Sequence, residues 1–205
     1  MTDTHHASND DTLKRGDALL IVDVQNDFCP GGALPIEDGD NVVPVINRWI
    51  EAAVRKDLPI YASRDWHPAG HISFTESGGL WPPHCIQDSN GAALHPDLQL
   101  PDATVKVTKG VRFDQDQYSA FHETGLAVRL RRDGIQRVWV MGLAEDVCVL
   151  ATVLDGLRED FEVVLVGDGT RSITPESGHK ARNEMRDAGA LIIRRPLSCN
   201  DPGRL

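Results

Sequence analysis

One cysteine, Cys148, stands where a helix is expected to begin directly after an apolar strand. The segment 138–149 reads as a buried strand that passes through Gly142 into a helix. The first turn of a helix offers unpaired N–H groups and the positive end of the helix dipole, which favour a thiolate and can hold a developing oxyanion. Cys148 is therefore a candidate nucleophile, although a buried cysteine is more often an inert packing residue.

Four further polar side chains follow predicted strands. Asp23 ends the first strand, Asp65 and His67 follow the second, and Lys109 follows the third. In α/β sheets, ligands bind beyond the carboxyl ends of the strands, where the strand order reverses. Each residue alone could be a cap or a solvated edge residue. Their placement after successive strands, together with Cys148, favours one active site at this edge of the sheet.

The pair Asp65 and His67 also has the spacing of a metal site. Residues two apart in an extended segment point to the same side, so a carboxylate oxygen and an imidazole nitrogen could reach one divalent ion. His84, which follows two prolines, is a third candidate ligand. An Asp/His/His set with open positions suits zinc, iron or manganese. His71 is a fourth imidazole nearby, and we expect it outside the ligand set.

The rest of the chain alternates between predicted strands and helices. Strands are expected at 18–23, 59–64, 103–108, 137–141, 162–166 and 190–193, and helices at 41–55, 124–133, 146–160 and 175–188. The pattern predicts a single α/β domain with a doubly wound, mainly parallel six-stranded sheet and helices on both faces. We expect this domain at 16–197, with flexible tails at 1–15 and 198–205. The irregular stretch 66–101, rich in Pro, Gly and His, has the length typical of functional loops.

The charge and hydropathy of the sequence exclude several classes of function. The 205 residues carry a net charge of −10 without a compensating basic run, which argues against a nucleic-acid partner. No apolar run approaches the roughly 20 residues that span a bilayer, and the polar N-terminus has no signal-peptide core, so we expect a cytoplasmic protein without a membrane partner. In that setting the four cysteines, Cys29, Cys85, Cys148 and Cys199, are expected as free thiols.

Taken together, these residues resemble the nicotinamidase/pyrazinamidase branch of the isochorismatase-like cysteine hydrolases. The resemblance spans about residues 17–196. It rests on five blocks in order: 23–28 (DVQNDF), 63–74 (SRDWHPAGHISF), 81–85 (WPPHC), 109–110 (KG) with 118–121 (YSAF), and 142–149 (GLAEDVCV). The metal block followed by WPPHC separates this branch from relatives that share only the catalytic triad.

The resemblance implies hydrolysis of nicotinamide, and of pyrazinamide, to the carboxylic acid and ammonia, in NAD salvage. Cys148 would attack the carboxamide carbon, Asp23 would carry the proton to the leaving ammonia, and Lys109 would stabilise the charged pair. The amides of Ala144 and Cys148 would form the oxyanion hole, with a cis peptide before Ala144.

The same resemblance implies one divalent metal ion, with zinc favoured and iron or manganese as alternatives. Asp65, His67 and His84 match the ligands of that ion. Phe28 and Trp81 match the aromatic residues that sandwich the substrate ring, which suits a flat heteroaromatic amide. Nicotinamide is thus the expected small-molecule partner, and relatives suggest a homo-oligomer.

Glu145 departs from the pattern, since many relatives have threonine there. A carboxylate beside the oxyanion hole needs solvent or a cation such as Arg112.

Two alternatives stay open. One is another amide or carbamoyl hydrolase of the superfamily, for instance on a ureido acid, although those relatives generally lack the metal set. The other is a non-catalytic metal-binding homologue, which retention of Asp23, Lys109 and Cys148 disfavours.

Overall fold

A single six-stranded sheet forms the centre of the protein. The computed structural model describes residues 13–194, so most of both predicted tails, and Cys199, lie outside the described residues. The strand order is β3-β2-β1-β4-β5-β6, and every neighbouring pair is parallel. The strands are β1 Asp17–Val22, β2 Ile60–Asp65, β3 Val105–Lys109, β4 Arg137–Leu143, β5 Glu162–Arg171 and β6 Leu191–Ile193. The predicted doubly wound sheet is confirmed, and it is parallel throughout.

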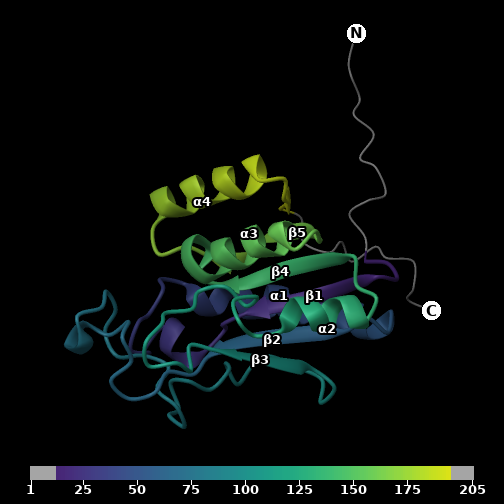
Figure 1. The fold of residues 1–205 in the computed structure, drawn as a ribbon. Coiled ribbons are helices and arrows are strands. Elements are labelled where there is room, and N and C mark those ends of the chain that lie inside the picture. Colours follow the sequence, from purple (N-terminus) through teal and green to yellow (C-terminus); the bar gives the residue numbers. More distant parts are fainter. Residues whose placement is uncertain (1–12, 195–205) are drawn as a thin grey trace.

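Helices cover both faces of this sheet, as predicted (Figure 1). They are α1 Val43–Arg55, α2 Leu126–Arg132, α3 Leu150–Arg158 and α4 Pro175–Asp187. The sequence fixes the ends of α4. Thr174 accepts a hydrogen bond from the amide of Ser177 in a capping box, Pro175 occupies the first turn, and Gly189 follows with φ +109°. None of the described helices is long and apolar enough to cross a membrane.

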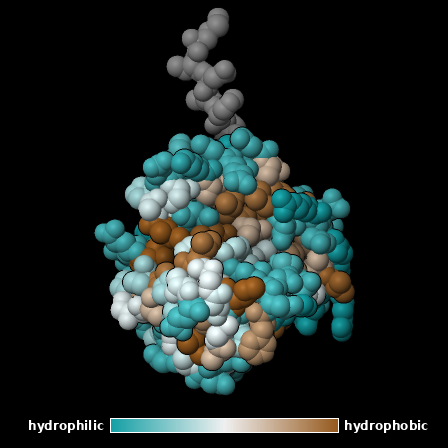
Figure 2. Space-filling view, turned by 60° about the vertical axis from the view of Figure 1, so that its left-hand side comes forward, coloured by the Kyte–Doolittle hydropathy of each residue, from teal (hydrophilic) through white to brown (hydrophobic). Residues whose placement is uncertain are grey.

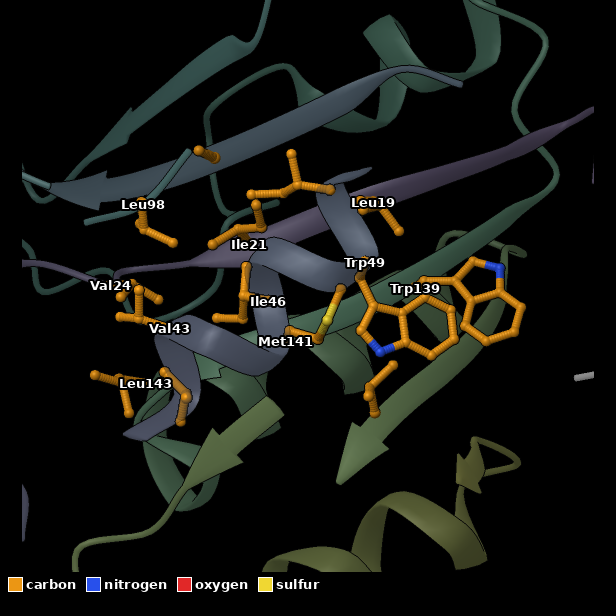
Figure 3. Close-up of a cluster of buried hydrophobic side chains, with 14 of the residues drawn as sticks. Leu19, Ile21, Val24, Val43, Ile46, Trp49, Leu98, Trp139, Met141 and Leu143 are labelled. Atoms are coloured by element: carbon orange, nitrogen blue, oxygen red, sulfur yellow. The ribbon is translucent and has the colours of Figure 1, made fainter. Parts of the chain in front are cut away.

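Two hydrophobic cores hold these layers together. On one face, α1 buries Ile46 and Trp49 against alternate residues of β1 and β4, and the rings of Trp49 and Trp139 lie 5.0 Å apart (Figure 3). On the other face, α2, α3 and α4 pack against the intervening residues of the same strands. Because both faces are covered, β1 and β4 are buried along their whole length, which explains their nearly continuous apolar sequences.

The strand order places the chain reversal between β1 and β4. From β1 the chain winds outward to β2 and β3, and from β4 it winds the other way to β5 and β6. The crevice of a doubly wound sheet lies at this point, beyond the carboxyl ends of the strands. Asp23 follows β1 and Cys148 follows β4, so the two residues come from the two strands that flank the crevice.

The long segment between β2 and β3 has little regular structure, as predicted, with one 3-10 turn at Thr75–Ser77. Its backbone is nonetheless tied to the sheet end. The amide of His67 donates to Cys85 at 2.9 Å, and the amide of Asn26 donates to Ala93 at 3.0 Å. Figure 1 shows much of this segment, in blue to teal, gathered at one side of the sheet. The loop thereby brings distant parts of the sequence to the crevice.

Two predicted boundaries are wrong near the crevice. The helix expected at 146–160 begins as a π-helical turn, Glu145–Val149, before α3 starts at Leu150. Such turns are frequent at functional sites. The strand expected to end at residue 166 continues to Arg171, with a register irregularity opposite Val140 and Gly142. The longer β5 arises from its pairing with β4, in which Gly142 lies opposite Thr170 and Leu143 opposite Arg171, and local sequence patterns do not encode such pairing.

Candidate active site

The three predicted catalytic side chains meet in the crevice. The ammonium of Lys109 lies 2.8 Å from Oδ2 of Asp23 and 3.5 Å from the sulfur of Cys148. Asp23 is fully buried, Lys109 is 1% exposed and Cys148 is 6% exposed. The three residues come from the ends of β1, β3 and the turn after β4, as the strand-end argument predicted. Water is therefore largely excluded around an acid, a cation and a thiol in mutual contact.

The environment of Asp23 favours a proton acceptor. Ser63 donates a hydrogen bond to Oδ1 of Asp23 at 2.7 Å, on the side away from Lys109. Burial raises the pKa of Asp23, and the nearby Lys109 lowers it without cancelling that effect. The positive charge of Lys109 alone would lower the pKa of Asp23, but the opposite effect of burial is larger. A carboxylate with a raised pKa accepts a proton from a thiol more readily.

The pKa of the Cys148 thiol also differs from the expectation, because it is raised rather than lowered. Burial raises the pKa of Cys148 well above its usual range, although Lys109 acts in the opposite direction. The helix start was expected to favour the thiolate, but desolvation outweighs that effect. The resting side chain is consequently a thiol. Its proton has an acceptor nearby in Asp23, because the sulfur of Cys148 and a carboxylate oxygen of Asp23 lie within 4.8 Å of each other.

The three predicted metal ligands also converge. Ligand atoms of Asp65, His67 and His84 all lie within 4.8 Å of one another, and all three residues are buried. Nδ1 of His67 contacts the carbonyl of His84 at 3.2 Å, and Nδ1 of His84 contacts the carbonyl of Pro82 at 2.7 Å. A carbonyl only accepts, so each Nδ1 carries the hydrogen and each Nε2 keeps its lone pair for a ligand.

The chemistry of this set fits a divalent ion. Nε2 of His67 is buried without a hydrogen-bond partner, which is unusual for a polar atom unless an ion binds it. Burial lowers the pKa of His67 to about 3, so its imidazole is neutral. A Cβ at Gly110 would lie 2.7 Å from that nitrogen, and the absent side chain leaves the space beside it open. Two imidazole nitrogens and one carboxylate are ligands that zinc, iron and manganese accept.

His71 lies beside this set without a free nitrogen. Nδ1 of His71 accepts from the amide of Ser73 at 3.3 Å and contacts the Ser73 hydroxyl at 2.7 Å. Its Nε2 then carries the hydrogen and donates to the carbonyl of Gln115 at 3.1 Å. The ring packs against His67, with centroids 4.3 Å apart. His71 therefore supports a ligand from outside the set, as expected.

Two polar residues that the sequence reasoning missed, buried Gln25 and half-buried Asp27, hold the ligand-bearing segments. The side chain of Gln25 accepts from the amide of Asp65 at 2.7 Å and donates to the carbonyl of Asp65 at 2.8 Å. Asp27 accepts from the amides of Cys85 at 2.7 Å and Ala33 at 3.0 Å. Both lie in the polar run directly after β1. That abrupt change from apolar to polar residues was the available signal.

A small cavity of about 90 Å³ adjoins both groups of residues. Phe28 and Trp81 line it, as predicted, together with Cys148, Ala144 and the three metal-ligand candidates. Its other lining residues were not predicted, namely Leu34, Pro35, Ile36, Asp116, Tyr118, Val147 and Ile173. Most come from loops without a periodic pattern, although Tyr118 and Val147 each belong to one of the five sequence blocks.

One of these missed residues stiffens an aromatic wall. The indole nitrogen of Trp81 donates to the hydroxyl of Tyr118 at 3.1 Å, which links the loop after β2 to the loop after β3. Figure 2 shows apolar surface gathered near the middle of one face and bordered by hydrophilic residues. Aromatic side chains joined by a hydrogen bond offer a flat, preorganised surface to an aromatic ligand.

The turn that carries Cys148 has the backbone that the resemblance implied. The peptide bond between Leu143 and Ala144 is cis. The carbonyl of Ala144 accepts from the amides of Val147 and Val149, on either side of Cys148. Ala144 and Cys148 both line the cavity. This is a suitable position for backbone donors to a substrate oxygen.

Glu145 has a different partner from the cation considered above. Its side chain is 2% exposed and pairs with Arg182 of α4. Arg112 instead contacts Asp114 and Glu123 at the surface. The suggestion of Arg112 is thus wrong, because α4 lies against the turn and supplies its own cation.

Known proteins have similar folds and similar sequences. Residues 17–196 match the family model described as Isochorismatase domain. A nicotinamidase of Escherichia coli (strain K12) is 40% identical over 198 residues, which cover 85% of this chain and 93% of that protein. The pyrazinamidase of Pyrococcus horikoshii, solved in complex with zinc, is 43% identical, with a TM-score of 0.85 over 88% of this chain and 99% of that one.

A third relative was solved with a small acid bound. PnC1 from L. infantum, in complex with nicotinate, is 38% identical, with a TM-score of 0.83 over 89% of this chain and 95% of that one. The resemblance carried by the five sequence blocks is confirmed. Because the family model spans residues 17–196 and a relative at 40% identity covers most of the sequence, the chain belongs to the isochorismatase family.

Proposed function

We propose that the protein hydrolyses nicotinamide, and also pyrazinamide, to the carboxylic acid and ammonia. The observation that carries this proposal is a single small cavity lined by Cys148, the metal-ligand set and two aromatic residues, Phe28 and Trp81. A flat heteroaromatic amide has large apolar faces, one ring nitrogen and one carboxamide, which these walls match. The relatives named above as nicotinamidase and pyrazinamidase support the same assignment.

In the first half of the reaction, the sulfur of Cys148 attacks the carboxamide carbon. The thiol proton passes to the carboxylate of Asp23, whose raised pKa suits this transfer. Lys109 contacts both side chains and offsets the negative charge that develops on sulfur. The amides of Ala144 and Cys148 donate to the tetrahedral oxyanion.

In the second half, the tetrahedral intermediate collapses. The carbon–nitrogen bond breaks, Asp23 returns its proton to the departing nitrogen, and ammonia leaves a thioester on Cys148. Water then attacks the thioester carbon while Asp23 takes one of its protons. The carbon–sulfur bond breaks, Cys148 recovers the proton through Asp23, and the carboxylic acid is released. The amide and one water supply every atom and proton of the two products, so no further reactant is needed.

Asp65, His67 and His84 would hold one divalent ion beside the cavity. When bound, the ion supplies a Lewis-acid contact for the ring nitrogen of the substrate. Zinc is favoured over iron and manganese because the relative from Pyrococcus horikoshii was solved with zinc. The aromatic pair Phe28 and Trp81 orients the ring, so that its carboxamide faces Cys148.

The carboxylic acid would enter NAD salvage, in the cytoplasm. A homo-oligomeric state stays a prediction. So do the domain boundaries at 16–197 with flexible tails on either side, and the absence of nucleic-acid and membrane partners.

The test is a substrate comparison with the purified, metal-loaded protein. Ammonia and nicotinate are measured together from nicotinamide, and ammonia is measured from pyrazinamide and from a ureido acid. We expect turnover of both aromatic amides and none of the ureido acid. Turnover of the ureido acid with inert nicotinamide would replace the substrate assignment. No turnover of any amide would favour the non-catalytic metal-binding homologue.

A further inference from the structure

A buried ion pair lies directly beside the nucleophile-bearing turn, and the mechanism above does not use it. Glu145 follows Ala144 in the chain and opens the π-helical turn that contains Cys148. Its carboxylate Oε1 accepts a hydrogen bond from Nη1 of Arg182, near the middle of α4. The Glu145 side chain is 2% exposed and that of Arg182 is 20% exposed. The pair is therefore mostly shielded from solvent screening.

The position of Glu145 creates an electrostatic problem for the proposed reaction. A carboxylate adjacent to Ala144 would oppose the negative charge that develops on the substrate oxygen. Such repulsion is strong where the local dielectric is low. The other charged groups that act on Glu145 are Arg194, which follows β6, and Asp146 on the same turn. Arg182 is the cation in direct contact with it.

We propose that Arg182 is a positioning residue for catalysis: it neutralises Glu145 and holds the turn that presents the amides of Ala144 and Cys148 to the oxyanion. This inference rests on the proposed amide hydrolysis. Arg182 does not line the cavity, so it acts through Glu145 rather than on the substrate.

A second set of contacts ties α4 to the same turn. Asp146 accepts a hydrogen bond from the amide of Ile173 at 3.0 Å and another from the hydroxyl of Ser177. Ile173 in turn lines the cavity. Two successive acidic residues of the turn thus bind the start and the middle of α4. Ile173, Ser177 and Arg182 are thereby part of the structure that shapes the site, although they supply no reacting group.

We expect the kinetic constants of three variants to follow a specific pattern. In Arg182→Gln the carboxylate of Glu145 stays buried without its cation, so kcat for nicotinamide falls about tenfold or more, with KM changed by less than about twofold. The double variant Glu145→Gln with Arg182→Gln removes both charges, and kcat returns to within about threefold of the original protein. Lys180→Gln is the matched control, because its ion pair with Glu176 is exposed on the same helix.

The pH profile distinguishes this electrostatic role from a structural one. Burial already raises the pKa of Glu145, and loss of Arg182 raises it further. Lowering the pH therefore protonates the unpaired carboxylate in Arg182→Gln. The ratio of original to variant kcat falls toward one at low pH and grows at high pH. In the double variant this ratio does not change with pH.

The outcomes separate the two proposals. If the original protein turns over nicotinamide and folded Arg182→Gln has the same kcat, the role of Arg182 is refuted while the proposed function stands. If the original protein is inert, the proposed function fails first. Should Arg182→Gln not fold, Glu145→Gln is compared with the double variant. Equal kcat values support the role of Arg182, and a tenfold slower double variant overturns it.

Discussion

The ammonium of Lys109 lies 2.5 Å from Oδ1 of Asp65, a residue of the metal-ligand set, while it also contacts Asp23. One buried cation thus neutralises two carboxylates, one proposed for proton transfer and one proposed for metal binding. Potential ligand atoms of Asp23, Asp65 and Cys148 lie within 4.8 Å of one another. The two carboxylates would repel each other without Lys109, so the halves of the site depend on one side chain.

Replacing this cation is expected to damage both stability and activity. Lys109→Met leaves two buried carboxylates without their cation, and loss of one partner from a buried ion pair costs about 3–5 kcal/mol of unfolding free energy. The rate of ammonia release should fall by about a thousandfold. Denaturant unfolding and initial rates measure the two effects. Lys106→Met, at an exposed position on the same strand, is the control. An active and equally stable Lys109→Met would contradict the shared-cation account.

Metal binding is expected to depend on His84 and not on surface imidazoles. His84→Ala removes one of three ligands, so the purified protein should lose most of its bound metal, measured by elemental analysis, and its activity with it. Chelation should abolish ammonia release from the original protein, and added zinc should restore it. His179→Ala, an exposed change on α4, should keep the full metal content. Full metal content in His84→Ala would exclude this ligand set.

Gly110 is expected to be needed for the space beside His67. A Cβ at residue 110 would lie 2.7 Å from Nε2 of His67, and φ at this residue is +66°. Gly110→Ala should therefore weaken zinc binding, measured by titration against a competing chelator. Gly125→Ala is a matched control, because φ there is +76° but no atom lies within 4 Å of the added Cβ. Equal zinc affinity in the two variants would show that the contact is unimportant.

The aromatic wall is expected to act on substrate binding. Trp81→Ala removes a ring from the cavity, so KM for nicotinamide should rise about tenfold, in line with the loss of one aromatic contact. Trp81→Phe and Tyr118→Phe each delete the hydrogen bond that joins these residues. Their effects on KM should not add, since both remove the same interaction. An unchanged KM in Trp81→Ala would remove this residue from the substrate site.

The sequence predicted the parts of the site that lie at strand ends. Asp23 and Cys148 follow buried strands and Lys109 ends β3, and a parallel sheet brings such strand ends together without further information. The metal-ligand candidates were identifiable because Asp65 and His67 are two apart in an extended segment. These inferences depend on regular geometry, which explains their agreement with the structure.

Features that depend on solvation and distant packing were not predictable. Burial raises the pKa of Cys148, an effect that the local helix start does not reveal. The cation for Glu145 is Arg182, which the sequence separates from it by helix α3, strand β5 and the first half of α4. Tyr118, Ile36 and other lining residues come from loops whose positions follow from tertiary contacts.

The most direct test of the central claim compares ammonia release from nicotinamide by the metal-loaded original protein and by Cys148→Ala. Both samples are matched for zinc content and thermal stability. We expect rapid release by the original protein and none above background by the variant, because the thiol forms the covalent intermediate. Substantial release by Cys148→Ala, or none by the original protein, would contradict it.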